Sequence, residues 1–385
     1  MQTRRSHNKS RRGCLECKRR RVKCDESRPR CLNCTRRHVV CDYGTHSLVW
    51  KDWKKERRPP KDSNRMISQD QRDDIFVTLE RLMASQNAEP MPATELNVVE
   101  LELMMHWCNS AYKLLTRNET TAQIWRELVP QEAFSHRFLL WGILSVSALH
   151  LSCFKAKEHQ SMYLKHAAFH QTRGLTLFRE ALQAVGPWNA KAMFAFASLV
   201  TVYAFGSSYS QESADPIQDL YQVLVLIRGT SEIVSRFSQT LLESDFAPLL
   251  RVSEQRNEIS ADTKAALTRL RTLNSSLQEG PESHKVHRKA IEDLEEMFSM
   301  STAGVASITA SGRWAVRLPP LFLEYLQERR NLTLVILAHY CVLLHHLRQH
   351  WCIAPWAARV SEAIWNVLDD RGRESIQWAM DQISE

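Results

Sequence analysis

Apolar residues in the last three quarters of the chain recur at helical spacing. Leu101, Met104, Met105, Cys108, Tyr112 and Leu115 follow an i, i+3, i+4, i+7 pattern, which predicts an amphipathic helix with these residues on its buried face. Residues 138–154 are apolar almost all round, which predicts a central, fully buried helix. Residues 332–350 and 355–368 have the same character and predict two further buried helices.

Turn and capping residues divide this helical region. Gly186-Pro187 is expected to separate two helices, and Asp215-Pro216 to cap and start another. A helix is predicted near residues 285–300, followed by a loop of small residues around 301–312. No useful run alternates between apolar and polar residues, so residues 96–385 are predicted to form one all-α domain.

The first part of the chain has a different composition. Residues 1–62 carry 20 Lys and Arg against 7 Asp and Glu, a net charge of +13, whereas the whole chain carries only +8. A basic excess of this size indicates a nucleic-acid partner. Residues 1–13 are predicted to be a basic arm, and residues 46–95 a basic linker ending in a short helix. The linker is expected to act as a tether that also contacts the DNA backbone.

Six cysteines lie in this basic region with a repeated spacing. They follow the pattern C-x2-C-x6-C-x6-C-x2-C-x6-C, in which the second half repeats the first after 17 residues; they are Cys14, Cys17, Cys24, Cys31, Cys34 and Cys41. No secretory signal opens the chain, so the thiols are expected to stay reduced and to bind metal rather than form disulfides.

Six thiolates can hold two tetrahedral zinc ions only if two of the thiolates bridge both ions. The repeat points to the first cysteine of each half, Cys14 and Cys31, as the bridges. One Zn2+ would then bind Cys14, Cys17, Cys24 and Cys31, and the second would bind Cys14, Cys31, Cys34 and Cys41. A 28-residue segment with five aliphatic side chains is too small to fold without this metal.

This segment resembles the fungal zinc binuclear-cluster (Zn2Cys6) transcription factors, whose cysteine spacing it matches at every position. The resemblance implies the same bridging pair and double-stranded DNA as the partner. It also implies a helix end whose adjacent basic residues read a short G/C-containing half-site in the major groove. Those positions are Arg20 and Arg21, and the full predicted DNA-binding set is Lys18, Arg19, Arg20, Arg21, Lys23, Arg36 and Arg37. Arg21 stands where the family usually has Lys, which can change the preferred base step.

The helical region is similar to the regulatory domain of the sterol-uptake regulator subgroup of this family. The similarity rests on Leu101–Met104, Phe134–Leu140, Ser147–His150 and Leu334–His345. It implies an all-α domain that controls output, and it allows a small lipophilic ligand inside that domain. Such a ligand would make the protein a sterol-like or lipid-like sensor whose readout is DNA binding, and this is the alternative function.

Several other functions find little support in the sequence. Residues 67–85 supply one short amphipathic helix rather than the three or four heptads of a coiled coil, so a homodimer is allowed but not indicated. No apolar stretch reaches the length of a membrane span. No catalytic motif is present, so an enzyme is not expected. A metal site at His339, His346 and His350 is conceivable, but buried core histidines are commoner.

The predicted architecture is a small metal-built Zn2Cys6 module followed by a large all-α domain. Its parts are a basic arm (1–13), a DNA-binding domain (14–45), a linker (46–95) and a regulatory domain (96–385). The predicted function is sequence-specific transcription regulation in the nucleus.

Overall fold

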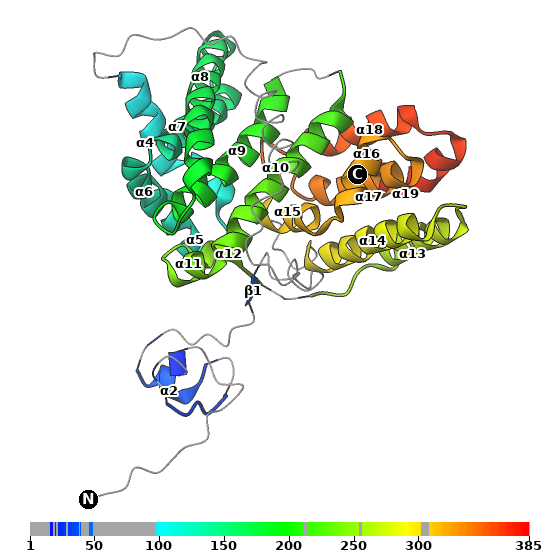
Figure 1. The fold of residues 1–385 in the computed structure, drawn as a ribbon, viewed down its shortest axis with the longest axis horizontal. Helices are drawn as coiled ribbons and strands as arrows, with labels where there is room; N and C mark the ends of the chain where they lie inside the picture. Colours follow the sequence, from blue (N-terminus) through cyan, green and yellow to red (C-terminus); the bar gives the residue numbers. More distant parts are fainter. Residues whose placement is uncertain are drawn as a thin grey trace, which may run out of the picture. The chain divides into compact units, whose positions relative to one another are not determined.

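Two compact units make up the chain, of which one is small and cysteine-rich and the other is helical (Figure 1). The computed structural model describes residues 16–17, 20, 22–27, 30–37, 39, 46–48, 97–210, 214–253, 256–301 and 308–384. The first unit runs to Leu48 and takes in Arg251–Gln255. The second unit comprises Val49–Leu250 and Arg256–Glu385. The predicted basic arm, and all of the predicted linker except residues 46–48, lie outside the described residues.

The small unit has little regular secondary structure. Residues 16 and 17 are helical, and α2 (Leu32–Thr35) is a single helical turn. Strands β1 (His46–Leu48) and β2 (Arg251–Ser253) pair antiparallel, with His46 opposite Ser253. The sequence predicted no strand, because three residues are too few for an alternating pattern to be recognised. The all-helical character of the second unit is unaffected.

The large unit is an assembly of helices. In chain order its described helices are α4 (Val98–Asn109), the 3-10 helix η2 (Ala111–Leu115), α5 (Glu119–Gln123), the π-helix η3 (Ile124–Leu128), α6 (Val129–Ser135), α7 (Arg137–Phe154), α8 (Lys157–Ala181), the 3-10 helix η4 (Leu182–Ala184), α9 (Ala190–Ser210), α10 (Pro216–Arg236), α11 (Ser238–Glu243), α12 (Ala247–Leu250), α13 (Ala261–Ser276), α14 (Pro281–Ser301), α15 (Ile308–Arg317), α16 (Pro320–Gln327), α17 (Asn331–His345), α18 (Trp356–Val367) and α19 (Asp370–Ser384). This confirms the predicted fold class.

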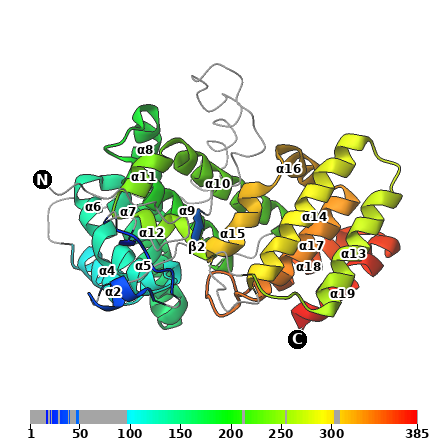
Figure 2. The same ribbon diagram turned by 90° about the horizontal axis from the view of Figure 1, so that it is seen from below.

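Helices from the two halves of this unit form two groups that α10 joins. In the first group α7 packs along α8 and α9, and in the second α17 packs against α14, α18 and α19. Helix α10 contacts α9 on one side and α15 and α18 on the other. Figures 1 and 2 show the two groups on either side of α10. Both groups therefore belong to one continuous core.

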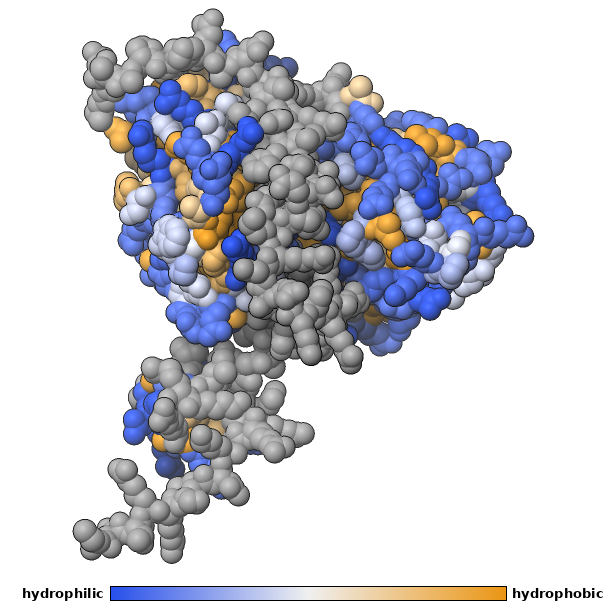
Figure 3. Space-filling model, viewed as in Figure 1, coloured by the Kyte–Doolittle hydropathy of each residue, from blue (hydrophilic) through white to orange (hydrophobic). Residues whose placement is uncertain are grey.

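The longest apolar helices are in the interior, as predicted. Helix α7 covers the predicted segment 138–154 and buries most of its length, and every residue of α17 from Leu332 to Leu344 is buried. Two helices, α7 and α9, have the length and apolarity of a membrane span, but 67% and 83% of their 18-residue windows are buried within the fold. Their apolarity is therefore accounted for by the core. On the side of the molecule that Figure 3 shows, the coloured surface is mostly hydrophilic, with scattered hydrophobic patches.

Two of the predicted helix boundaries are confirmed at the expected residues. The chain leaves its helical path at Gly186-Pro187, between η4 and α9. Helix α10 begins at Pro216, and the Asp215 carboxylate accepts a hydrogen bond from the Gln218 backbone N–H at 3.1 Å. A capping carboxylate satisfies a backbone donor that the helix itself leaves unpaired.

The predicted buried face of the first helix is correct only in part. In α4 the fully buried residues are Leu103 and Trp107, whereas Leu101 and Met105 are 53% and 65% exposed. The Trp107 indole N–H donates to the Trp125 carbonyl at 2.9 Å, which fixes the rotation of the helix about its axis. Because α4 ends at Asn109, Tyr112 and Leu115 belong to η2 rather than to the same helix, and there both are buried as predicted.

This corrected face predicts unequal effects of two truncations on one helix. Trp107→Ala removes a fully buried side chain and its hydrogen bond, so we expect it to lower the free energy of unfolding by about 3–5 kcal/mol. Leu101→Ala, at an exposed position, should change it by less than about 0.5 kcal/mol. Urea unfolding followed by circular dichroism measures both. Equal losses would show that Leu101 is buried after all.

Two other predicted boundaries need correction. The segment expected to be a loop around residues 301–312 includes the start of α15, which is helical from Ile308 onward. Small residues mask the helical pattern there because Ala and Ser carry little hydropathy signal. The helix expected at residues 332–350 ends earlier, at His345, and continues as turns.

Candidate metal centre and nucleic-acid interface

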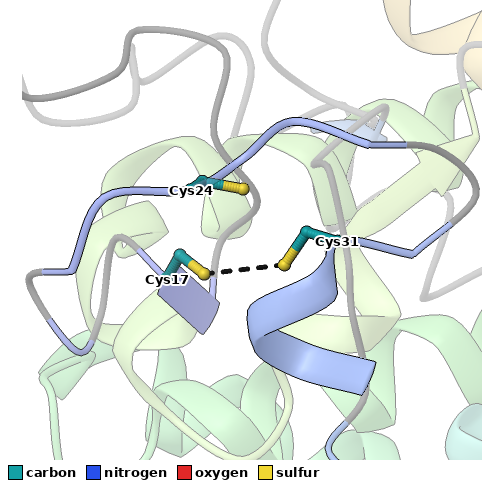
Figure 4. A group of neighbouring side chains, drawn as sticks. All are labelled: Cys17, Cys24 and Cys31. Carbon is teal, nitrogen blue, oxygen red and sulfur yellow. Dashed lines mark hydrogen bonds between the residues drawn. The ribbon is translucent and has the colours of Figure 1, made fainter. Parts of the chain in front are cut away.

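Three of the six predicted metal ligands converge in the small unit. The Sγ atoms of Cys17, Cys24 and Cys31 lie within 4.8 Å of one another, and all three side chains are buried (Figure 4). The Sγ atoms of Cys17 and Cys31 are 3.7 Å apart. Two sulfur ligands of one tetrahedral zinc ion, each about 2.3 Å from the metal, lie about 3.8 Å apart. The spacing therefore fits two thiolates on one zinc.

The surroundings of these sulfur atoms suit thiolates. The Glu26 backbone N–H donates to Cys24 Sγ at 3.4 Å, and the Cys34 N–H donates to Cys31 Sγ at 3.4 Å. The second contact makes Cys31 the N-cap of α2. Donors directed at sulfur stabilise the ionised form, which is the form that binds metal. The donor set thus fits zinc, and the three cysteines are three of the four ligands predicted for the first ion.

The 17-residue repeat of the sequence also appears in the backbone. The Val22 N–H donates to the Cys17 carbonyl at 3.0 Å, and the Val39 N–H donates to the Cys34 carbonyl at 3.2 Å. The donor and the acceptor of the second hydrogen bond each lie 17 residues after those of the first. Cys34 is fully buried with the other thiols, and Val39 packs against the cluster. The described parts of the two halves are therefore built alike around the metal ligands, as the repeated cysteine spacing predicts.

Asp25 connects the two halves of the cluster. Its carboxylate accepts hydrogen bonds from the Ser27 hydroxyl and from the backbone N–H groups of Leu32 at 3.1 Å and Asn33 at 3.5 Å. These bonds, with the Ser27 hydroxyl foremost, hold the pKa of Asp25 well below its usual range. The Asn33 side chain in turn donates to the Lys23 carbonyl at 2.8 Å. Together these contacts hold the loop between the halves against the start of α2.

Arg20, predicted to read bases, lies against the cluster in this structure. Its Nε is 3.3 Å from Glu16 Oε1, one helical turn earlier, and its Nη2 lies 3.9 Å from Cys34 Sγ. The guanidinium therefore bridges the helical turn of the first half and a thiol of the second. Its positive charge lies where it offsets the negative charge of the thiolates.

The other predicted DNA-contacting residues are either exposed or outside the described residues. Lys23, Arg36 and Arg37 are exposed, and Arg36 is the C-cap residue of α2. Lys18, Arg19 and Arg21 lie outside the described residues, as do Cys14 and Cys41. The role of Cys14 and Cys31 as bridging ligands, and the DNA contacts of all seven basic residues, therefore stay predictions.

His339 is the member of the considered histidine metal site that lies in the core of the helical unit, whereas His346 and His350 are only partly buried. His339 is buried, its ring lies against Trp378, and its Nδ1 is 2.8 Å from the Val335 carbonyl. Burial lowers its pKa to about 4. Within the part of the chain that the structure describes, the only group of three or more candidate ligands is the cysteine group. Burial also raises the pKa of the Cys108 and Cys153 thiols, as it does for ordinary core cysteines.

Two residues that organise the site were missed from the sequence. Glu16 precedes Arg20 by four residues, and this i, i+4 spacing of opposite charges is a recognisable helical pair. Asp25 offers no comparable signal, because the backbone partners through which it connects the two halves lie seven and eight residues away across a loop.

Two protein-family models match the chain and define its class. The fungal Zn(2)-Cys(6) binuclear cluster domain matches residues 12–48, and the fungal specific transcription factor domain matches residues 102–236. The second match ends at the last residue of α10. The chain thus carries a fungal Zn2Cys6 cluster domain and a fungal specific transcription factor domain, in agreement with the predicted resemblance and zinc cofactor, and both matched families are families of transcription factors.

Curated relatives agree with this class. A Zn(2)-C6 fungal-type transcription factor of Gibberella zeae is 31% identical over 242 residues, covering 54% of this chain and 48% of the relative. Sterol uptake control protein 2 of Saccharomyces cerevisiae is 58% identical over 106 residues (27% of this chain, 11% of that protein). The Candida albicans protein of the same name is 44% identical over 124 residues (32% and 17%). The chain therefore spans about half the length of the first relative and much less of the other two.

Proposed function

We propose that this chain is a nuclear, sequence-specific DNA-binding transcription regulator that reads a short G/C-containing half-site through its zinc cluster. The observation that carries the proposal is the convergence of buried thiols, spaced as zinc ligands, within a strongly basic segment. When bound, the two zinc ions supply the folding free energy that the small unit cannot obtain from apolar burial. The protein then presents basic side chains on a rigid surface.

The basic residues are proposed to divide into two roles. Arg21 is the stronger candidate for base recognition, because Arg donates two hydrogen bonds to the O6 and N7 atoms of guanine. Arg20 would have to leave Glu16 and Cys34 to reach a base, so its present contacts favour a positioning role in the unbound chain. Arg36 and Arg37, exposed in the second half, suit contacts with phosphates.

These roles predict different patterns of lost affinity for two substitutions. Arg21→Ala should weaken binding to the preferred site by about 1–3 kcal/mol. It should also reduce the difference in affinity between the preferred site and sites with one altered base pair. Arg36→Ala should weaken binding to every duplex alike. It should also lower the slope of the logarithm of the binding constant against the logarithm of the salt concentration by about one, because one phosphate contact is lost. Fluorescence anisotropy on duplexes that differ at single base pairs, at several salt concentrations, measures both effects.

Arg348→Ala in the helical unit is the control variant, since this arginine is exposed and far from the cluster in sequence. It should bind all duplexes as the unsubstituted chain does. Parallel, sequence-independent losses for Arg21→Ala and Arg36→Ala would contradict the division of roles.

A single cluster reads only a few base pairs, so useful specificity requires a second contact with DNA. A homodimer that places two clusters on one site would provide it, and this stays a prediction. The helical domain is proposed to control the output of the bound protein, as the similarity of residues 102–236 to the fungal specific transcription factor domain supports.

A further inference from the structure

A cleft in the helical unit lies among six of its elements. Residues of η2, η3, α9, α10, α12 and α15 contribute to its walls, and about 70 Å3 of it is accessible to the centre of a water-sized sphere. Its lining is mainly apolar, with Trp125, Phe194 and Ile227 among the larger side chains. Since one water needs roughly 10–15 Å3 on this measure, the cleft has room for several water molecules or for a small ligand.

Arg117 supplies the only formal charge in the lining of this cleft. Its Nη2 donates to the carbonyls of Pro248 at 2.8 Å and Leu249 at 3.0 Å. Its Nη1 is buried and makes no hydrogen bond to any described residue. Burial lowers the pKa of Arg117 to about 10, so the side chain stays charged at neutral pH. The described part of the chain thus leaves a buried cationic donor without an anionic partner.

The hydroxyl groups in the cleft carry no charge and do not pair with Nη1 in this structure. Ser198, Thr201 and Thr230 each donate to the backbone carbonyl four residues earlier, at 2.9, 3.0 and 3.1 Å. Their protons are therefore used, and a bound anion would receive its hydrogen bond from Arg117. A buried donor without an acceptor costs about 1–3 kcal/mol, and more when it is charged. The cleft consequently favours a bound molecule that brings a negatively charged acceptor.

The backbone around the cleft is irregular in the same place. Leu115 ends the 3-10 helix η2, Arg117 follows it, and Trp125 lies in the π-helix η3. π-helical turns are rare and are frequently found at functional sites. The Trp125 carbonyl also accepts the hydrogen bond from Trp107, which holds this turn against α4.

We propose that this cleft binds a small monocarboxylic acid. On binding, Arg117 turns Nη1, which is buried in the unbound chain, toward the carboxylate, and the short apolar body lies between Trp125, Phe194 and Ile227. A carboxylate satisfies the unpaired donor and the charge together, and the body buries apolar surface against the walls. The acidic head group makes this ligand class more specific than the small lipophilic ligand that the sequence similarity allowed. The site does not depend on DNA binding by the cluster.

The test measures acid binding to the full chain at pH 7. Benzoate and octanoate are titrated by isothermal calorimetry next to benzyl alcohol and 1-octanol, which match them in size but carry no charge. We expect saturable one-to-one binding of at least one acid, at least about tenfold tighter than its neutral match, because a charge-assisted hydrogen bond is lost with the carboxylate. Absence of binding by both acids, or equal binding by acid and alcohol, would overturn the proposal and leave a solvent-filled cleft.

Three variants assign the binding to this cleft. Arg117→Gln should weaken acid binding about tenfold or more, whereas Arg126→Gln, at an arginine paired with Glu127 outside the cleft, should leave it unchanged. Gly312→Leu fills the cleft from α15, where a Cβ would approach no atom of another residue closer than 3.7 Å, and a helical leucine favours folding. It should block binding even if Arg117→Gln fails to fold. Undiminished binding by Gly312→Leu would also overturn the proposal.

Discussion

Removal of zinc with a strong chelator is expected to unfold residues 14–41 and to abolish DNA binding, while the helical unit keeps its structure. Structural zinc contributes about 10–16 kcal/mol per ion at neutral pH, far more than the aliphatic side chains of this segment could replace. The helical unit has its own continuous core, so its unfolding should not depend on the metal.

Circular dichroism and DNA-binding titrations before and after chelation measure the two effects on one sample. Addition of Zn2+ should restore binding, whereas addition of Mg2+, which prefers oxygen ligands, should not. DNA binding that persists in metal-free protein would contradict the account of the cluster. Loss of helix content together with binding would show that the two units fold as one.

Replacing single cysteines should remove unequal amounts of metal. If Cys31 bridges both ions, Cys31→Ala takes a ligand from each site, and the variant should retain close to no zinc. Cys34→Ala removes a ligand from the second site only, so the variant should retain about one ion per chain. Cys31 Sγ lies near both Cys17 and Cys24, as a ligand of the first site requires, and its share in the second site stays a prediction. The free energy at stake is that of one or two structural zinc ions, about 10 kcal/mol or more each.

Metal content per chain, measured by native mass spectrometry, separates the cases. Cys341→Ala is the matched control, since this thiol is equally buried but belongs to α17 in the helical unit. It should retain both ions. Equal zinc contents for the Cys31 and Cys34 variants would contradict the bridging role of Cys31.

Local signals in the sequence predicted much of this fold. Helix α7 is apolar all round, so no choice of face was needed to place it in the core. Asp215 and Pro216 mark the start of α10 because both act through the helix backbone next to them. In each case the physical cause lies within a few residues of the element that it determines.

The failures arose where distant residues decide the outcome. Helix α4 has apolar residues on more than one face, and Trp125 decides that Trp107 rather than Leu101 is buried. The donor Arg117 was missed because the cleft is assembled from helices far apart in sequence. Conversely, the cysteine spacing predicted the three thiols that converge, Cys17, Cys24 and Cys31, because zinc geometry imposes strict spacing on so short a segment.

Selection of binding sites from a random pool of DNA duplexes tests the central claim most directly. The zinc-loaded full chain is compared with the Cys31→Ala variant under identical salt. The account predicts that the zinc-loaded chain enriches one short G/C-containing motif and that the variant enriches none. Failure of the zinc-loaded chain to enrich any motif, or enrichment of the same motif by the variant, would contradict it.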